Sequence, residues 1–210
     1  MKIDSPAFFI DIGICTGCKT CMVACKDKNS LGDGIRWRRV YEFTGGQWTP
    51  RDDGLYTPDL FTYYLSIACN HCENPACVAA CPTRAMAKNA DGIVYVDASR
   101  CVGCRYCEWA CPYSAPQFDP DRGVMAKCDF CRTKEHEAAS PACAAACPTR
   151  ALTFGDYDRL KKEQGSSAGI PPLPDPALTS PCLVIRPPRK KGEDREARGM
   201  ILNPEEVRDA

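Results

Sequence analysis

The apolar positions of this chain fall in short runs, and none approaches the roughly 20 residues that a membrane-spanning helix needs. Runs rich in aromatic and β-branched residues predict short strands at 8–12 (FFIDI), 35–43 (IRWRRVYEF), 60–68 (LFTYYLSIA) and 93–97 (IVYVD). The pattern predicts an α+β protein built of small sheets, with no membrane span of its own.

Two hairpins are predicted around these strands. The strands at 35–43 and 60–68, with a turn at Gly45-Gly46, would form an added β-hairpin within the segment 30–68. Residues 82–100 (PTRAMAKNADGIVYVDASR) fit a strand, a turn that contains Asp-Gly, and a second strand. The aromatic residues of the first hairpin suit either a core or a contact with another subunit.

The C-terminal segment 156–210 is predicted to hold one short helix and an extended arm. GDYDRLKKEQG at 155–165 has Asp156 near the N-cap of a helix and Gly165 just past its end. Seven prolines in residues 170–188 favour an extended arm that lies along a partner protein.

Composition and charge narrow the class of protein. Lysine plus arginine number 27, as do aspartate plus glutamate, so there is no basic excess to indicate a nucleic-acid or anionic-membrane binder. The first residues, MKIDSPAFFIDIG, show no signal peptide and no twin arginine. We therefore expect a protein that folds in the cytoplasm, where thiols stay reduced.

Cysteine accounts for 17 of the 210 residues, about 8%, which approaches the level of a cysteine-built scaffold. Sixteen of them form four groups: Cys15, Cys18, Cys21 and Cys25; Cys69, Cys72, Cys77 and Cys81; Cys101, Cys104, Cys107 and Cys111; Cys128, Cys131, Cys143 and Cys147. Groups one and three have the spacing C-x2-C-x2-C-x3-C, and groups two to four are each followed by proline. This spacing is the bacterial ferredoxin signature for [4Fe–4S] clusters, in which the fourth cysteine binds the other cluster of a pair.

Zinc and disulfides are weaker explanations of these groups. A structural zinc site pairs two C-x2–4-C knuckles across a longer gap, and three cysteines spaced this closely crowd a tetrahedral ion. An odd cysteine count also fits poorly with a closed set of disulfides. The sequence therefore favours four [4Fe–4S] clusters bound by sixteen cysteines.

Internal repeats indicate how the groups pair. PACVAACPTRA at 75–85 matches PACAAACPTRA at 141–151, and CTGCKTC at 15–21 resembles CVGCRYC at 101–107. The hairpin at 82–100 is the connection that joins the halves of a small ferredoxin, so groups two and three should pair, and groups one and four are left for each other. A sequential pairing, one with two and three with four, stays open.

The first of these pairings gives two bacterial ferredoxin-like modules, with the central one nested within the outer one. The outer module spans 1–29 and 112–155, the inserted hairpin region 30–68 and the central module 69–111. The four ligand sets are Cys15, Cys18, Cys21 and Cys147; Cys128, Cys131, Cys143 and Cys25; Cys69, Cys72, Cys77 and Cys111; Cys101, Cys104, Cys107 and Cys81.

No catalytic residues are predicted. The chain has no Gly-rich phosphate loop, hydrolase motif or nucleophile elbow, and it has only two histidines. His71 suits packing or a hydrogen bond to sulfur, His136 suits the surface, and Cys182 suits an ordinary thiol. Basic residues next to the cysteine groups could raise cluster potentials: Lys19, Lys26, Arg84, Arg105, Lys127 and Arg150.

The four cysteine groups, in this order, resemble those of the four-cluster iron–sulfur subunits of molybdopterin oxidoreductases. The segments FFIDIGICTGCKTCMVACKD, YYLSIACNHCENPAC and CVGCRYCEWACPYSAPQ are most similar to the iron–sulfur subunit of anaerobic dimethyl sulfoxide reductase complexes. The resemblance covers roughly residues 7–205, and it implies the pairing of one with four and two with three. Nitrate-reductase relatives hold a [3Fe–4S] centre where a tryptophan replaces the residue equivalent to Cys104, so four cubanes are expected here.

The resemblance also implies a role and partners. This subunit would relay electrons between a multi-helix anchor subunit that oxidises quinol and a molybdopterin catalytic subunit that reduces dimethyl sulfoxide or a related S- or N-oxide. It would be held at the membrane by the anchor, either exported with a twin-arginine partner or kept on the cytoplasmic face. The same relay in a polysulfide, tetrathionate, thiosulfate, selenate or formate enzyme complex, and a soluble polyferredoxin-type carrier, stay as alternatives.

Overall fold

A computed structural model describes residues 5–131, 140–164, 169–188 and 199–207. Across these ranges the chain is an α+β protein with two three-stranded sheets, three two-stranded sheets and short helices. No helix among them is both long and apolar enough to cross a membrane.

The first sheet joins three distant parts of the chain. Strand β1 (Pro6–Asp11) pairs antiparallel with β10 (Leu152–Asp156) and parallel with β11 (Leu183–Arg186). All six residues of β1 are buried, since helix α5 (Tyr157–Gln164) packs on one face and the main core lies on the other. The strand expected at 8–12 and the helix expected at 155–165 are therefore both present, and they lie side by side.

The proline-rich segment differs from its prediction, because its described part lies along this chain itself. Strand β11 is buried in the first sheet, after a short 3-10 helix at Pro176–Leu178. Backbone hydrogen bonds join the residues just before β11 to residues 70–74. The Glu73 N–H donates to the Ser180 carbonyl at 2.8 Å, and the Cys182 N–H donates to the Asn70 carbonyl at 3.0 Å. Pairing with β1 buries three consecutive apolar residues of the segment: Leu183 and Ile185 pack in the main core, and Val184 packs in the cluster that includes Leu160 of α5.

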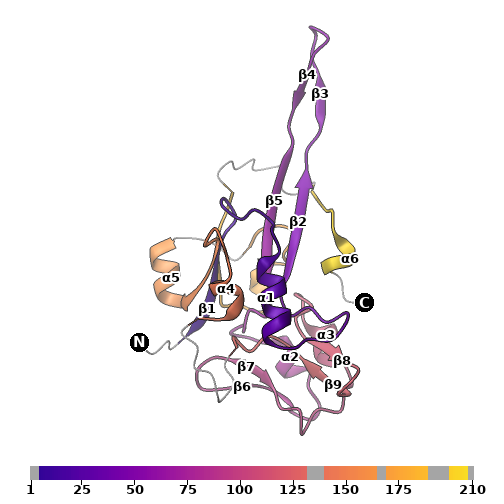
Figure 1. Cartoon of the computed structure of the whole chain (residues 1–210), viewed down its shortest axis with the longest axis vertical. Helices are drawn as coiled ribbons and strands as arrows, with labels where there is room; N and C mark the ends of the chain where they lie inside the picture. The colour runs from indigo at the N-terminus through magenta and orange to yellow at the C-terminus, as the bar shows by residue number, and fades with distance from the viewer. Residues whose placement is uncertain (1–4, 132–139, 165–168, 189–198, 208–210) are drawn as a thin grey trace.

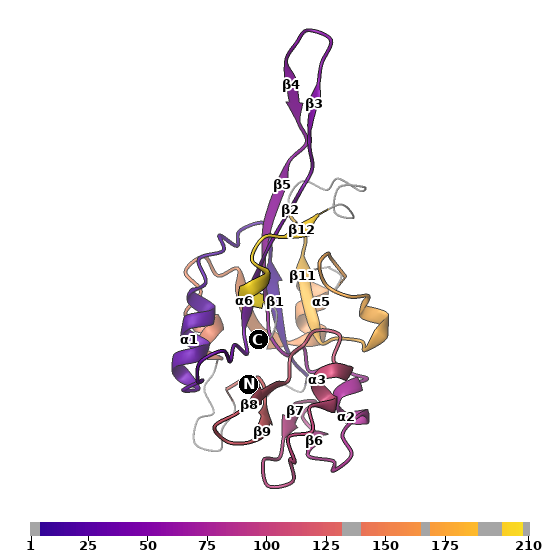
Figure 2. The same ribbon diagram turned by 90° about the vertical axis from the view of Figure 1, so that its right-hand side faces the viewer.

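The second sheet is the base of a long two-stranded extension (Figures 1 and 2). Strand β2 (Arg39–Gly45) pairs antiparallel with β5 (Phe61–Ile67), and β12 (Met200–Ile201) pairs with the other edge of β2. Beyond it, β3 (Trp48–Pro50) pairs with β4 (Tyr56–Pro58) and projects from the body. The chain therefore reverses near Gly54, and the turn predicted at Gly45-Gly46 is a bend between two pairs of strands.

Two small hairpins and several short helices carry the cysteine groups. Strand β6 (Met86–Lys88) pairs with β7 (Val94–Val96), as the pattern at 82–100 predicts, and β8 (Gln117–Asp119) pairs with β9 (Val124–Ala126). The helices at the groups are α1 (Thr20–Lys28), α2 (Ala76–Ala79), α3 (Tyr106–Ala110) and α4 (Ala142–Ala145). Helix α1 contacts α4, and α2 contacts α3. A last short helix, α6 (Pro204–Val207), lies against β2.

Cysteine is part of the interior. The largest buried cluster combines aromatic and aliphatic residues of β1, β2 and β5, such as Phe8, Phe43 and Leu65, with Cys21, Cys25 and four other buried cysteines. A smaller buried cluster joins Cys77 and Cys107 to Met86, Val94 and Met125. The apolar core is thus arranged around thiols, as the composition indicates.

We predict that Gly46→Ala opens the base of the extension. Gly46 has φ +95°, and a Cβ there would lie 1.8 Å from the carbonyl oxygen of Asp59, so the backbone at Asp59 and Leu60, between β4 and β5, must move. Gly54→Ala is the matched control, since Gly54 also has a positive φ (+79°) but nothing within 4 Å of a Cβ, and it should cost only about 1–2 kcal/mol. Hydrogen–deuterium exchange at 39–67 should accelerate much more in the first variant, and equal acceleration in both would show that the close approach to Asp59 does not matter.

Candidate metal centres

The cysteine loops share a backbone conformation. The residue before the second cysteine of each group has a left-handed φ: 67° at Gly17, 44° at His71, 65° at Gly103 and 63° at Phe130. At Gly17 a side chain would also collide with the ring of Tyr64, because its Cβ would lie 2.4 Å from that ring. The first turn of each group therefore has the same backbone conformation, although two of the groups have a bulky residue at the strained position.

Short helices bring in the later cysteines of each group. Helix α1 begins directly after Lys19 and carries Cys21 and Cys25, which are four residues apart and so about 6 Å apart along the helix axis. Helix α3 begins after Arg105 in the same left-handed conformation and carries Cys107. The third and fourth cysteines of a group are thus displaced from one another, so they can serve different sites.

The first cavity is lined by cysteines of the first and the last cysteine group, which are far apart in the sequence. Cys15, Cys18 and Cys21 of group one line it together with Cys147 of group four. Ile10, Val40 and Leu152 are among its apolar lining residues, contributed by β1, β2 and β10. These four thiols are the set that the pairing of group one with group four puts together.

The second cavity has the same composition in the central segment. It is lined by Cys101, Cys104 and Cys107 of group three and by Cys81 of group two. The apolar part of its lining includes Met86, Val96 and Met125 from three hairpin strands. This set corresponds to the pairing of group two with group three.

Within each of the other two predicted ligand sets, the thiols interact electrostatically. The first of these sets consists of Cys128, Cys131, Cys143 and Cys25. Burial raises the pKa of Cys25 to about 12; Arg38 opposes the rise, and negative charge on Cys143 and Cys131 adds to it. Burial likewise raises the pKa of Cys128 well above its usual value, and charge on Cys25 and Cys143 adds to the rise.

The last predicted ligand set shows the same kind of interaction. It consists of Cys69, Cys72, Cys77 and Cys111. Burial raises the pKa of Cys72 to about 12; a hydrogen bond from Thr179 opposes the rise, and charge on Cys69 and Cys111 adds to it. Burial is also the main cause of the raised pKa of Cys77, followed by charge on Cys69 and Cys111.

This donor set fits iron–sulfur clusters. Several soft thiols share each site, and the raised pKa values mean that they would be neutral without a cation to hold them ionised. Among the described residues, no three His, Cys, Asp or Glu side chains converge closely enough to hold a single metal ion. A cubane does not require such convergence, because each of its four thiolates binds a different iron.

Backbone N–H groups donate to several of the sulfurs. The Met86 N–H lies 3.3 Å from Cys81 Sγ, the Met125 N–H lies 3.3 Å from Cys101 Sγ, and the Leu152 N–H lies 3.4 Å from Cys147 Sγ. All three donors belong to strands that follow or precede a cysteine group. Hydrogen bonds to cluster sulfurs are among the factors that set reduction potentials, so these strands position the sites and also tune them.

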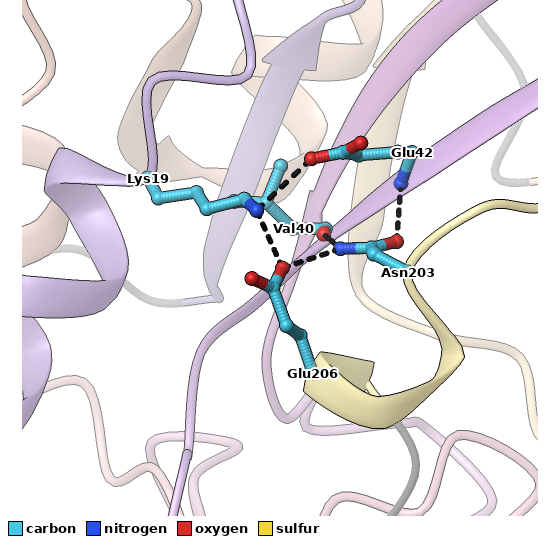
Figure 3. Close-up of polar contacts among 5 residues, drawn as sticks. All are labelled: Lys19, Val40, Glu42, Asn203 and Glu206. Carbon is cyan, nitrogen blue, oxygen red and sulfur yellow. Dashed lines mark hydrogen bonds and ion pairs between the residues drawn. The ribbon is translucent and has the colours of Figure 1, made fainter.

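Two of the six basic residues that the sequence associates with cluster potentials, Lys19 and Arg105, are paired with carboxylates. Lys19 Nζ lies 2.9 Å from a carboxylate oxygen of Glu42 and 2.5 Å from one of Glu206 (Figure 3). Arg105 donates two hydrogen bonds, of 2.7 and 2.8 Å, to Glu108. A cation paired with a carboxylate changes the local potential less than an unpaired one, so these two are poor candidates for tuning.

The Lys19 contacts also fix helix α6 to the first cysteine loop. Asn203 accepts a hydrogen bond from the Glu42 N–H at 2.9 Å and donates to the Val40 carbonyl at 2.9 Å and to Glu206 at 2.7 Å (Figure 3). Its side chain thereby continues the pairing of β12 along β2. The hydrogen bond from Lys19 lowers the pKa of Glu206, which keeps this carboxylate ionised.

Three buried cations near the thiols were not predicted to be buried. Arg38 and Arg39 are each 1% exposed and Lys127 is 4% exposed. Lys127 Nζ donates to the carbonyls of Cys128 and Val94, and Arg39 donates to the carbonyls of Tyr113 and Ser114. An Arg-Arg pair would be exposed in most half-buried strands; here carbonyl oxygens accept from Arg39, and negative charge on nearby thiols favours the burial of Arg38.

The remaining sequence candidates lie outside the cavities. His71 is fully buried, stacks on Phe130 with ring centroids 3.9 Å apart, and accepts a hydrogen bond from the Val94 N–H at Nδ1. Burial, with charge on Lys127 and Lys88, holds its pKa well below the usual value, so it is neutral and its proton is on Nε2. Cys182 is half-buried beside β1 and lines neither cavity, and His136 lies outside the described residues.

Comparisons with known proteins agree with this chemistry. A sequence model of the 4Fe-4S dicluster domain matches residues 60–157. The protein is 48% identical over 200 residues to a component of the anaerobic dimethyl sulfoxide reductase of Haemophilus influenzae, covering 95% of this chain and 98% of that one. It is 48% identical to the corresponding component from Escherichia coli strain K12, covering 95% and 97%. It is also 40% identical to a component of the polysulfide reductase of Wolinella succinogenes, covering 87% and 94%.

The similarity to the two dimethyl sulfoxide reductase components runs over nearly the whole length of both partners and includes all four cysteine groups. The protein therefore belongs to the iron–sulfur subunit family of anaerobic dimethyl sulfoxide reductases, and it binds [4Fe–4S] clusters.

Proposed function

We propose that this protein is the electron-transfer subunit of a membrane-bound reductase complex. It relays electrons through four [4Fe–4S] clusters, from a multi-helix anchor subunit that oxidises quinol to a molybdopterin catalytic subunit. The catalytic subunit reduces dimethyl sulfoxide or a related S- or N-oxide. The observation that carries the proposal is the presence of cavities lined by four cysteines each in a chain with sixteen grouped cysteines.

We further propose the nested arrangement of two ferredoxin-like modules. The cavity lined by Cys15, Cys18, Cys21 and Cys147 supports an outer module of 1–29 and 112–155, and the cavity lined by Cys81, Cys101, Cys104 and Cys107 supports a central module of 69–111. The charge interactions of Cys25 with Cys131 and Cys143, and of Cys77 with Cys69 and Cys111, support the other two ligand sets. The added hairpin lies within 30–68, between the two parts.

When bound, the clusters supply one-electron carriers. The protein holds the sulfurs at fixed positions, excludes water from the buried thiols and donates backbone hydrogen bonds to sulfur. None of these roles involves substrate chemistry, and this is why the protein is proposed to be a non-catalytic subunit.

Electrons need an entry and an exit, and two of the proposed sites are suited to these roles. Cys18 and Cys104 are exposed, whereas the cysteines of the set with Cys128 are all buried. Helices α1 and α3, which adjoin the two exposed cysteines, lie on opposite sides of the body (Figure 2). Val102 and Trp109, with 67% and 73% exposure, offer an apolar contact surface around the Cys104 site.

The proposed partners account for further exposed apolar residues. Trp48, Leu55 and Tyr56 on the projecting strands β3 and β4 and their turn are all more than half exposed. We propose that the extension contacts another subunit of the complex, and that the anchor subunit keeps this protein at the membrane. Either face of the membrane is compatible with the proposal.

The names of the relatives support two alternatives within the same role. The polysulfide reductase component is 40% identical, and a component of the sulfite dehydrogenase of Allochromatium vinosum is 36% identical, so the complex could act on another sulfur compound. A soluble polyferredoxin-type carrier is the third possibility, and the exposed apolar extension disfavours it.

The relay can be tested in the intact complex. Addition of a menaquinol analogue to anaerobic membranes should bleach the visible absorbance of the clusters, and subsequent dimethyl sulfoxide should restore it. Cys104→Ser should slow either step at least tenfold, because it disturbs the exposed end of the relay. Cys182→Ser should change neither rate.

Two results would contradict the proposed function, the first in its substrate and the second in the relay itself. Reoxidation by polysulfide but not by dimethyl sulfoxide would assign the protein to a different complex. Recovery of the protein as a separate 23.1 kDa species in anaerobic extract would favour the carrier.

The nested pairing predicts which cysteine variants affect the same cluster. Cys147→Ser and Cys15→Ser should each alter one common EPR signal and lower bound iron by up to about a quarter, because one of four cubanes loses a ligand. Cys81→Ser and Cys101→Ser should share a second signal. Under sequential pairing, Cys147→Ser would instead alter the same signal as Cys101→Ser.

Removal of iron should unfold much of the protein. The buried thiols occupy positions that aliphatic side chains would fill in an ordinary core, and metal binding supplies folding free energy in such proteins. Chelation under anaerobic conditions should increase protease cleavage at least tenfold, and reconstitution with iron and sulfide should reverse it. Unchanged protease resistance of the iron-free protein would show that the clusters are not structural.

A further inference from the structure

Arg38 is a permanent charge buried in the middle of the molecule. Its side chain is 1% exposed and immediately precedes strand β2. Arginine is not deprotonated in proteins, so the charge persists at every working pH. Burial of such a charge is costly unless opposite charge lies nearby.

The polypeptide partners of Arg38 are too few to offset this cost. Nη1 donates to the carbonyl and the hydroxyl oxygens of Ser66 at 3.3 and 3.1 Å, and the guanidinium lies over the ring of Phe8 at 4.1 Å. Nε and Nη2 are buried and have no hydrogen-bond partner among the described residues, and none of the ion pairs found there includes Arg38. Buried donors nearly always find acceptors, so these two indicate an acceptor beyond the described part of the chain, such as a cluster sulfur.

The opposite charge comes from the thiols. Burial by itself lowers the pKa of Arg38, and negative charge on four cysteines more than reverses this effect: Cys143, Cys21, Cys128 and Cys25. Cys21 belongs to one proposed ligand set and the other three belong to the second. These cysteines are carried by α1, α4 and the segment after β9, and α1 and α4 lie side by side (Figure 1). Arg38 therefore acts on two neighbouring sites at once.

Ser66 links Arg38 to Cys21 through hydrogen bonds. A guanidinium can only donate hydrogen bonds, so the Ser66 hydroxyl accepts from Arg38 and its own proton is available. Ser66 Oγ lies 3.2 Å from Cys21 Sγ, and a thiolate at Cys21 would accept that proton in a hydrogen bond. The order Arg38, Ser66, Cys21 is thus fixed by donor and acceptor chemistry.

We propose that Arg38 is the shared counter-cation of the two clusters in the outer module and that it raises the reduction potentials of both. This inference rests on the proposed function, because it assumes clusters at these two ligand sets. Reduction adds one electron and one negative charge to a site without breaking a bond. A cation in a medium of low dielectric constant favours the reduced form, and a hydrogen bond to a ligand sulfur acts in the same direction.

The test is an EPR-monitored redox titration of the full-length protein in its anaerobically purified complex. Arg38→Leu should lower the midpoint potentials of two centres, each by about 59 mV or more, which is a tenfold loss of preference for the reduced form. Arg38→Lys should restore most of the shift, since it keeps the charge. Ser66→Ala should lower only one of these two potentials, that of the cluster bound by Cys21.

Arg186→Leu is the matched control. The Arg186 guanidinium also lies over a β1 aromatic ring, 5.3 Å from the ring centre of Phe9, but it is paired with Asp11 and is largely exposed. This variant should leave all midpoint potentials unchanged.

The outcomes distinguish a failure of the Arg38 role from a failure of the proposed function. Four titrating centres in the unmodified protein and no shift in Arg38→Leu would overturn the role of Arg38 and leave the proposed function intact. Fewer than four centres in the unmodified protein would overturn the proposed function itself. Arg38→Leu could not be used if it lost iron, and the other two variants would then test the proposal. Unchanged potentials in Ser66→Ala would refute it. A full downward shift in Arg38→Lys would also refute it.

Discussion

The cost of burying thiolates, to which their mutual repulsion adds, is the constraint on which the rest of this structure depends. Thiols packed this closely in a protein interior stay neutral unless a cation compensates them, and neutral thiols do not bind metal. Iron supplies most of that compensation in the holo-protein. The polypeptide supplies the remainder through backbone N–H groups at Cys81, Cys101 and Cys147 and through cations buried beside the sites. The unusual burial of Arg38, Arg39 and Lys127 is a consequence of this arrangement.

The constraint also explains the small size of the secondary structure elements. Each cysteine group needs a loop with left-handed residues and then at most a few turns of helix, so α2, α3 and α4 span only four or five residues. The hairpins near the sites, such as β6–β7, are also short, because they need only present N–H groups and apolar side chains to a cavity. The longest strands, β2 and β5, border the first site only at one end, through Val40 and Ser66, and continue from there into the extension.

Much of this organisation follows from the sequence, because cysteine spacing and turn chemistry are local signals. The strand at β1, the Asp-Gly hairpin of β6–β7 and the helix α5 were all predicted close to their observed bounds. The hairpin β8–β9 was missed, because QFDPDRGVMA has too few apolar residues to show a strand period. The burial of Arg38 could not be predicted, since it depends on thiols from α1 and α4 that only tertiary structure brings near. The path of the proline-rich segment depends in the same way on an open edge of β1.

The contact between Lys19 and Glu206 has a consequence for how the protein is made. The two residues are 187 positions apart, so the first cysteine loop lacks this restraint until nearly the whole chain has left the ribosome. At roughly 5–20 residues per second, that interval is about 10–40 s. Cys15, Cys18 and Cys21 are therefore synthesised long before Glu206, the residue that anchors their loop to helix α6.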